Sequence, residues 1–495
     1  MTVYFGTVFI AMFLVPIVSR LAKWYRLVDA PGPRKVHQIP IPRIGGIVFI
    51  VSTLALVLPV FFLNNDIGQS FRDSLTEFIV LLVAAGFVFL VGLIDDLRPV
   101  RGYIKLLCLI GASLIICASG SALHSISVGT WFEIETGWAA WPLTVFWIVM
   151  ITVCMNLIDG LDGLAAGIAA IVCGTIVLMA LWSGQVAMAV LMLALLGSVT
   201  GFLFFNFYPA KIFMGDCGSM FLGFFIGAGS LVCQTKTHTL VGLAIPFLVM
   251  GVPIIDTCFV LISRRFIERR SMFASDRSHL HHHLLDLGLH HRTVVIILYA
   301  VTAISASIGL FTLTIEGGWS IGLLAVGLLL LFSMFACLHG RRYFEILMVI
   351  KRNLAIINDA RTYRHTFEMA QVRMRESNSF QEWWNAICIM GQKMHFQSIG
   401  LWNCRSNNYI RSCSWDVSDE KFLKGKTAKF ILPLRGNEEG ETEWELRAHT
   451  SVNGYLELSG QQALLLARLM DEFPLPDLTE ETEQLELFPS KKTNL

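Results

Sequence analysis

Long apolar segments separated by short polar loops fill the first 340 residues of the chain. A helix needs roughly 20 mostly apolar residues to cross the hydrocarbon core of a bilayer. The pattern therefore predicts an all-α polytopic membrane domain over residues 1–340, with about 11 transmembrane helices. These predicted spans are 2–20, 44–63, 77–95, 104–120, 139–157, 163–182, 186–206, 218–234, 239–262, 293–314 and 318–338.

Charged residues become frequent after residue 340. Residues 1–340 contain 34 of the 75 Asp, Glu, Lys and Arg residues, whereas residues 341–495 contain the other 41. This shift predicts a membrane domain followed by a small cytoplasmic α+β domain. The parts expected after the membrane domain are a helical linker over 341–375, the α+β domain over 376–473 and an acidic, disordered tail over 474–495.

Short alternating segments predict the elements of the α+β domain. Their order is distantly similar to that of a GAF domain, but no ligand motif is present. A regulatory or partner-binding module and an inert stabilising cap are both open as roles for this domain. The sequence predicts helices over 382–394 and 461–473, and strands over 398–404, 429–435, 443–449 and 454–459.

The composition excludes several classes of protein. Hydrophobic residues make up 55% of the chain and charged residues 15%, and the mean hydropathy is +0.62. This balance excludes disorder, collagen-like repeats and a small disulfide scaffold. Most of the eleven cysteines lie inside apolar runs, where a thiol is usually a small hydrophobe, and no CxxC pair is present. The net charge of +1 is spread over loops, so we expect no nucleic-acid partner.

The distribution of Lys and Arg predicts how the chain is oriented in the membrane, because cytoplasmic loops carry an excess of these residues. The loops after spans 1, 3, 5, 7 and 9 contain sixteen of them, whereas the opposite loops contain two, Arg72 and Lys236. The first span has no basic stretch before it, so we expect it to be uncleaved, with the N-terminus outside. The chain is predicted to be a multi-pass protein of the inner (plasma) membrane.

Paired carboxylates end the third span in the run VGLIDDLRPV. Asp95 and Asp96 repel each other at the mouth of an apolar helix, and a divalent cation or a raised pKa relieves such repulsion. A water-exposed helix end explains the pair equally well when it is taken alone.

A second acidic group follows the fifth span in the run NLIDGLDGLAAG. Asn156, Asp159 and Asp162 are spaced by three, which places their side chains on one face of a helix or tight turn. Hard oxygen ligands of this kind suit Mg²⁺, which keeps waters and shares its shell with substrate phosphates. A helix cap with a turn is the alternative, and the EF-hand calcium pattern is absent.

Lys211 and Asp216 follow the seventh span in the run FNFYPAKIFMGDCGSM. Backbone N–H groups at a helix start and a nearby Lys form an anion site, while Asp216 can hold a cation that bridges phosphates. Gly-Asp-x-Gly by itself is common in turns, so this motif gains weight only beside the others.

Histidines dominate the loop after the ninth span, in the run ASDRSHLHHHLLDLGL. Three alternatives are open for this loop: a zinc site, a loop that binds phosphate and sugar, or a polar surface. Its candidate residues are Arg277, His279, His281 and His282. The density of arginines favours a loop for a nucleotide-linked substrate. Three basic residues of the first loop lie on the same predicted side: Lys35, His37 and Arg43.

All five loops that carry these motifs are cytoplasmic by the charge count. Carboxylates for a metal, basic groups for phosphates and a membrane-embedded rim predict phosphoryl transfer between a soluble nucleotide and a lipid. A lipid-linked sugar transporter is the rival from another class, but it would need charges near the bilayer midplane. A membrane sensor is a further rival, although no output signature follows the spans.

The motifs as a set resemble a known family. DD at 95–96, NLIDGLDGL at 156–164, FMGDCGS at 213–219 and HLHH at 279–282 are similar to those of the polyprenyl-phosphate N-acetylhexosamine-1-phosphate transferases of glycosyltransferase family 4. The resemblance implies a Mg²⁺-dependent enzyme, with Mn²⁺ as the alternative ion. It also implies transfer of a sugar 1-phosphate from a UDP-sugar to undecaprenyl phosphate, with release of UMP, as the first step of a cell-surface polysaccharide.

The resemblance further implies a branch of the family. The branch that uses UDP-N-acetylmuramoyl-pentapeptide has Phe-Glu after three histidines, where this chain has Leu284 and Leu285. The chain is therefore more similar to the undecaprenyl-phosphate N-acetylglucosamine-1-phosphate transferases, with the pentapeptide transferase as the alternative.

Roles for individual residues follow from the resemblance and the motifs together. Metal ligands are expected at Asp216, Asp159 and Asp96, and catalytic carboxylates at Asp95, Asp96, Asp159 and Asp162, with the choice between base and metal ligand open for the DD pair. Beyond the substrates, a homodimer and a cytoplasmic partner of the C-terminal domain are expected. Substrate contacts are expected from Lys35, His37, Arg43, Lys105, Asn156, Lys211, Arg277, His279, His281 and His282.

Overall fold

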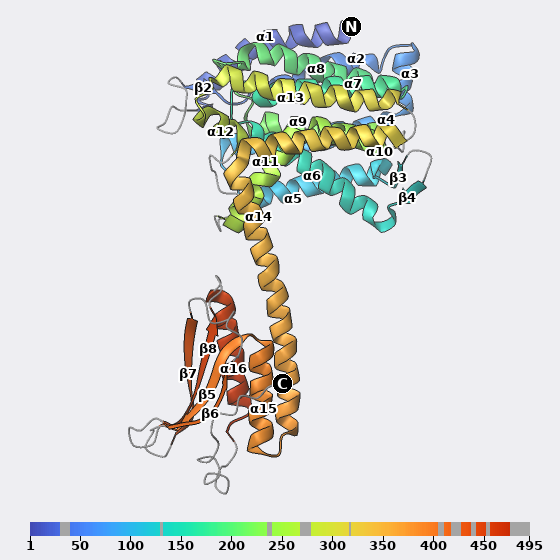
Figure 1. Cartoon of the computed structure of the whole chain (residues 1–495). Helices are drawn as coiled ribbons and strands as arrows, with labels where there is room; N and C mark the ends of the chain where they lie inside the picture. Colours follow the sequence, from blue (N-terminus) through green and yellow to red (C-terminus); the bar gives the residue numbers. More distant parts are fainter. Residues whose placement is uncertain are drawn as a thin grey trace. The chain divides into compact units, whose positions relative to one another are not determined.

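The chain divides into two compact units, Met1–Ile346 and Leu347–Leu495. The first is a bundle of helices, and the second contains a four-stranded sheet with helices (Figure 1). The computed structural model describes residues 1–29, 40–128, 132–234, 240–267, 279–315, 318–403, 410–416, 427–436, 442–451 and 456–475.

The first unit consists of helices with two short antiparallel hairpins between them. β1 (Val28–Asp29) pairs with β2 (Ile41–Pro42), and β3 (Ser125–Val128) pairs with β4 (Phe132–Glu135). The helices are α1 Thr2–Trp24, α2 Gly46–Val60, α3 Asp66–Asp73, α4 Leu75–Leu97, α5 Gly102–Ile116, α6 Ala140–Ile158, α7 Leu164–Trp182, α8 Val186–Asn206, α9 Gly215–Gln234, α10 Leu240–Val249, α11 Gly251–Ile262, α12 Leu280–Asp286, α13 His291–Phe311 and the first part of α14 Gly318–Glu376, whose residues from Leu347 onward belong to the second unit.

In the part of the chain that the structure describes, nine helices are long and apolar enough to cross a membrane. They correspond to nine of the predicted spans. The other two predicted spans, 44–63 and 239–262, contain shorter helices: α2 has 15 residues, and α10 and α11 have 10 and 12. Pro253 lies in the first turn of α11, where a missing N–H is tolerated, so the helix is interrupted just before it.

Helix α9 is the centre of the bundle, and its small residues allow this. In the most apolar stretch of α9, 94% of the residues are buried, whereas in that of α1 only 22% are buried. A Cβ atom on Gly223 of α9 would lie 2.6 Å from Cα of Thr152 in α6, and one on Gly92 of α4 would lie 2.6 Å from Cα of Cys217. Small side chains at these positions let neighbouring backbones approach closely. The predicted span 218–234 is therefore surrounded by protein.

The polar loops gather at one end of the bundle. α4, α6 and α8 end there and α5, α7 and α9 begin there, close to β2 and α12, whereas α3 and the β3–β4 hairpin lie at the opposite end (Figure 1). The described parts of the loops that carry the sequence motifs therefore meet in space.

The second unit has a sheet covered on one face by helices (Figure 1). Its strands are antiparallel in the order β6-β5-β8-β7. Ile399 and Leu446 of the sheet are fully buried against Ile387 and Leu466 of the helices. The elements after α14 are α15 Phe380–Lys393, β5 Phe396–Asn403, β6 Ile410–Asp416, β7 Thr427–Gly436, β8 Thr442–Ser451 and α16 Leu456–Glu472.

One sequence prediction for this unit is wrong, and one strand was not predicted. The predicted strand 454–459 overlaps α16, which begins at Leu456, because Leu458, Gln462 and Leu466 are buried at helical spacing. Strand β6 was not predicted, since its run IRSCSWD is polar and only its pairing with β5 reveals it. The predicted linker 341–375 forms part of α14, and the predicted tail lies outside the described residues from 476 onward.

Gly223→Ala is expected to lower stability, because the new methyl group would meet the backbone of Thr152. Overpacking of this kind costs about 1–3 kcal/mol. Gly111→Ala in α5 is the matched control, because nothing lies within 4 Å of its Cβ position. Thermal unfolding in detergent should show a lower Tm for Gly223→Ala and an unchanged or higher Tm for Gly111→Ala. Equal Tm values for the two variants would contradict the packing of α9.

Candidate functional site

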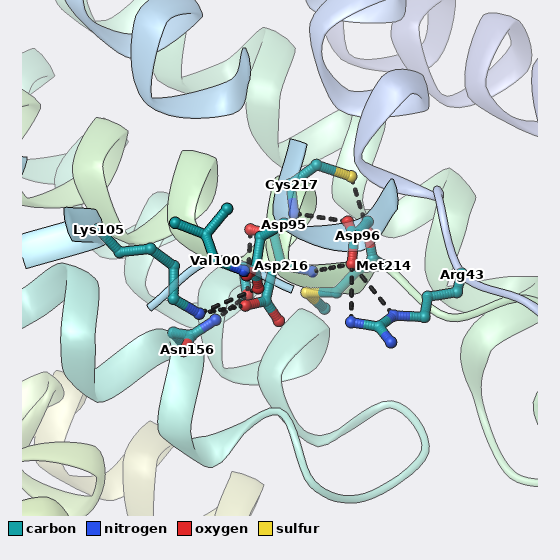
Figure 2. A network of polar contacts seen from close by, with 10 residues as sticks. Arg43, Asp95, Asp96, Val100, Lys105, Asn156, Met214, Asp216 and Cys217 are labelled. Atoms are coloured by element: carbon teal, nitrogen blue, oxygen red, sulfur yellow. Dashed lines mark hydrogen bonds and ion pairs between the residues drawn. The ribbon is translucent and has the colours of Figure 1, made fainter. Parts of the chain in front are cut away.

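A single lysine joins two of the predicted carboxylates. Lys105 lies in the first turn of α5, and its Nζ donates to Oδ2 of Asp95 at 3.0 Å and to Oδ2 of Asp216 at 2.9 Å (Figure 2). Asp95 is near the end of α4 and also accepts from the backbone N–H of Val100 at 2.7 Å. Three helices are therefore held together by one ammonium group at the polar end of the bundle.

Asp96 caps the N-terminus of α9. Its side chain is fully buried, and it accepts from the backbone N–H groups of Asp216 at 3.0 Å and Cys217 at 2.9 Å (Figure 2). Arg43 donates to the same carboxylate from Nε and Nη2, both at 3.1 Å. Although burial disfavours its charge, the carboxylates of Asp96 and Asp216 raise the pKa of Arg43. Two N–H groups that a helix leaves without partners are satisfied in this way.

The loops after α6 and α8 are tied to each other by side chains. Oδ2 of Asp162 accepts from the backbone N–H of Ala210 at 2.9 Å. Asn206 accepts from Gly163 N–H at 3.1 Å and donates to the carbonyl of Ile212 at 2.9 Å. The segment that leads into α9 is thereby fixed against the Asp159–Gly163 turn.

Asp159 differs from the other carboxylates of the site. It is the C-terminal cap residue of α6 and is half-buried, and its carboxylate makes no hydrogen bond within the described residues. Burial, together with the carboxylates of Asp216 and Asp96, raises the pKa of Asp159 to about 8. A cation near Asp159 would relieve this repulsion. Asn156, one turn earlier, donates to Oγ of Ser219 at 2.9 Å.

The histidine segment, residues 279–283, packs against the Asp159–Gly163 turn. His281 is 2% exposed, and a Cβ on Gly160 would lie only 2.8 Å from its Nε2 atom. Burial lowers the pKa of the His281 imidazole to about 3, so the ring is neutral at pH 7. The rings of His279 and His282 lie 5.5 Å and 4.4 Å from that of His281. The predicted histidines therefore do lie beside the acidic turn.

The remaining predicted residues are placed less informatively. The side chain of Lys211 is exposed and forms no ion pair with the described residues. Lys35, His37 and Arg277 lie outside the described residues, so their predicted roles stay predictions.

Two polar residues of the site escaped the sequence analysis. Asn206 is 3% exposed and ties two loops, and Ser219 is 1% exposed and accepts from Asn156. Asn206 ends a long apolar helix, and a polar side chain in such a place is a signal worth following. Ser219 carries no such signal, because serine is common where helices pack.

Carboxylates outnumber cations in the described part of the site: it contains five aspartates, and Lys105 and Arg43 pair with three of them, Asp95, Asp96 and Asp216. No three His, Cys, Asp or Glu side chains among the described residues form a group that could hold a metal ion. Mg²⁺ does not require one, since it keeps several waters and binds one or two carboxylates with substrate phosphates. The hard oxygens of Asp216, which is 25% exposed, and of unengaged Asp159 fit that need.

Known proteins are similar to this chain in sequence. A probable undecaprenyl-phosphate N-acetylglucosaminyl 1-phosphate transferase of Bacillus subtilis is 41% identical over 291 residues, which cover 59% of this chain and 78% of the relative. The family model for glycosyl transferase family 4 matches residues 78–234. The chain belongs to glycosyl transferase family 4. The resemblance seen in the sequence is thereby confirmed.

Other relatives of this family 4 chain carry two kinds of name. A decaprenyl-phosphate N-acetylglucosaminephosphotransferase of Mycobacterium leprae is 34% identical, covering 60% of this chain and 79% of the relative. A phospho-N-acetylmuramoyl-pentapeptide-transferase of Desulforudis audaxviator is 30% identical, covering 60% of this chain and 92% of the relative. With its apolar helices, this family 4 chain is a multi-pass membrane protein and a transferase.

Lys105→Met is expected to destabilise the protein, because it leaves the carboxylates of Asp95 and Asp216 without their shared cation. Removing one partner of a partly buried ion pair costs about 1–3 kcal/mol. Asp216→Asn in the same chain should recover part of that loss, since one of the two charges is gone. A double-mutant cycle by thermal unfolding measures this coupling. Lys211→Met is the control, because this lysine is exposed and forms no ion pair among the described residues. Additive effects of Lys105→Met and Asp216→Asn would contradict the bridge.

Proposed function

We propose that this protein transfers N-acetylglucosamine 1-phosphate from UDP-N-acetylglucosamine to undecaprenyl phosphate, releasing UMP and beginning a cell-surface polysaccharide. The observation that carries the proposal is the meeting of Asp159 and Asp216 with Lys105 and Arg43 at one end of an apolar bundle. Relatives that bear this activity in their names support the choice of reaction.

The proposed step exchanges one phosphoanhydride bond for another. An oxygen of the lipid phosphate attacks the β-phosphorus of the UDP-sugar, and the bond from that phosphorus to the bridging oxygen breaks, so UMP leaves. A phosphate monoester has its second pKa at about 6, so the attacking group is largely a dianion at neutral pH. Attack then requires positioning and charge neutralisation more than a base.

Lys105 and Arg43 are the described cations that would contact the phosphates. Lys105 is 23% exposed at its side chain and Arg43 39%, so both reach the surface of the site. Asp216 and Asp159 would hold Mg²⁺, or Mn²⁺ in its place. The bound ion would neutralise charge that develops on the pyrophosphate and on departing UMP.

Three aspartates receive positioning roles in this proposal. Asp96 holds the N-terminus of α9, Asp162 holds the loop before α9, and Asp95 holds Lys105. Every one of them already accepts backbone or lysine hydrogens. Their contacts favour holding the site over the catalytic or metal-binding roles expected from sequence.

The histidine segment supports N-acetylglucosamine over the muramoyl-pentapeptide. Leu284 and Leu285 stand where the pentapeptide branch has Phe-Glu, and Leu284 is only 3% exposed. The leucine side chains offer no hydrogen bond to a polar substrate group that a Glu at this place could bind, and hydrogen bonds of that kind are what give a site strong discrimination. The pentapeptide transferase is the second candidate, because relatives with that name are 30–33% identical.

The proposed orientation puts the N-terminus outside and the site and C-terminal domain in the cytoplasm, where soluble UDP-sugars are found. The excess of Lys and Arg in the motif-bearing loops supports it. The carboxylates lie at one end of the bundle, which argues against a transporter with a midplane site. A homodimer and a cytoplasmic partner stay predictions.

Product analysis tests the proposal. Purified protein with radiolabelled UDP-N-acetylglucosamine, undecaprenyl phosphate and Mg²⁺ should form lipid-linked sugar and UMP, and EDTA should abolish this. Asp216→Asn and Asp159→Asn should each lower turnover at least about 10²-fold, because charge stabilisation is lost. Asp66→Asn is the control, because Asp66 begins α3 at the end of the bundle opposite to the site. Product from the pentapeptide donor alone, or full activity in EDTA, would contradict the proposal.

A further inference from the structure

A buried carboxylate in α11 holds the histidine segment by two hydrogen bonds. Asp256 is 2% exposed in an otherwise apolar helix. Its Oδ2 lies 2.8 Å from Nδ1 of His279, and its Oδ1 accepts from the backbone N–H of Leu280 at 2.7 Å. A carboxylate in such surroundings is costly unless it is paired, so this two-point contact defines where the segment begins.

The contact determines how the ring of His279 is presented. An ionised carboxylate only accepts hydrogen bonds, so Nδ1 carries the proton that faces Asp256. Nε2 is then the atom left for other contacts, and it makes no hydrogen bond with the described residues. In metal sites and catalytic sites the same arrangement fixes the tautomer and the plane of an imidazole.

The ring of His279 is also linked to the acidic turn. It stacks on His281 with an interplanar angle of 11°. His281 in turn packs on Gly160, next to Asp159, so closely that no Cβ fits between them. Asp256, His279, His281 and Gly160 therefore form a continuous row of contacts that leads to Asp159 in the candidate site.

We propose that Asp256 is a positioning residue for the transfer reaction, which holds His279 with Nε2 turned toward the phosphate and sugar oxygens of the UDP-sugar. The inference rests on the proposed function. Asp256 does not touch the substrate; it acts through His279.

The decisive variants separate the two nitrogens of His279. In His279→Asn the side-chain amide can still donate to Asp256 but has nothing in the place of Nε2. This variant should keep the wild-type Tm and lose roughly 10- to 100-fold in kcat/KM for UDP-N-acetylglucosamine, the range seen when such partners are removed. Wild-type kcat/KM in His279→Asn would overturn the proposal, because the pair would then be only structural.

A double-mutant cycle tests whether Asp256 acts through His279. Asp256→Asn should lower kcat/KM by a similar factor, and adding it to His279→Ala should cause no further loss. Additive losses would overturn the proposal. Asp286→Asn, at the exposed end of α12, is the matched control and should behave as wild type.

Binding of UDP-N-acetylglucosamine, measured by calorimetry on the same purified proteins, separates the two proposals. A wild-type protein that binds the donor but forms no lipid-linked product would contradict the proposed function. In that case weaker affinities in both Asp256→Asn and His279→Asn than in Asp286→Asn would still support the role of Asp256, and an affinity of Asp256→Asn equal to that of Asp286→Asn would overturn it.

Discussion

The N-terminus of α9 is the point where the apolar bundle meets its polar groups, and the buried carboxylate of Asp96 holds it there. Asp96 satisfies two backbone N–H groups of α9 and is itself neutralised by Arg43. The positive end of the helix dipole favours a carboxylate at this position. Because Asp216 is the second residue of α9, its side chain is placed by the same contacts.

The rest of the site follows from that anchor. Once α9 is fixed, Lys105 can reach Asp216 and Asp95 together, and Asp162 can hold the chain that enters α9. Asp159 is then left without a hydrogen bond to any residue that the structure describes, and its pKa is raised. The aspartates thus divide into those that hold backbone or lysine and those whose charge is available to a cation and phosphates. Small residues along α9 make the arrangement possible, since they admit the neighbouring helices.

Much of this could be predicted from the sequence, because motifs at helix ends on one side of a membrane must meet. What could not be predicted is which contacts each of the chemically identical aspartates makes. Asp95 and Asp96 are adjacent and chemically identical, and only the fold shows that one faces α9 and the other Lys105. The partner of Asp256 was equally hidden, since His279 lies 23 residues away. Strand β6 was missed because its polar run gains meaning only from its neighbour.

Thermal unfolding of Asp96→Asn beside Asp159→Asn tests the central claim, that these two aspartates have different tasks. Asp96→Asn places an amide N–H₂ against backbone donors and Arg43, so its Tm should fall by at least about 5 °C. Asp159→Asn replaces a carboxyl group whose charged form is disfavoured by burial and repulsion, so the Tm of this variant should equal or exceed that of the wild type. Equal losses of Tm in the two variants, or an unchanged Tm for Asp96→Asn, would contradict the account.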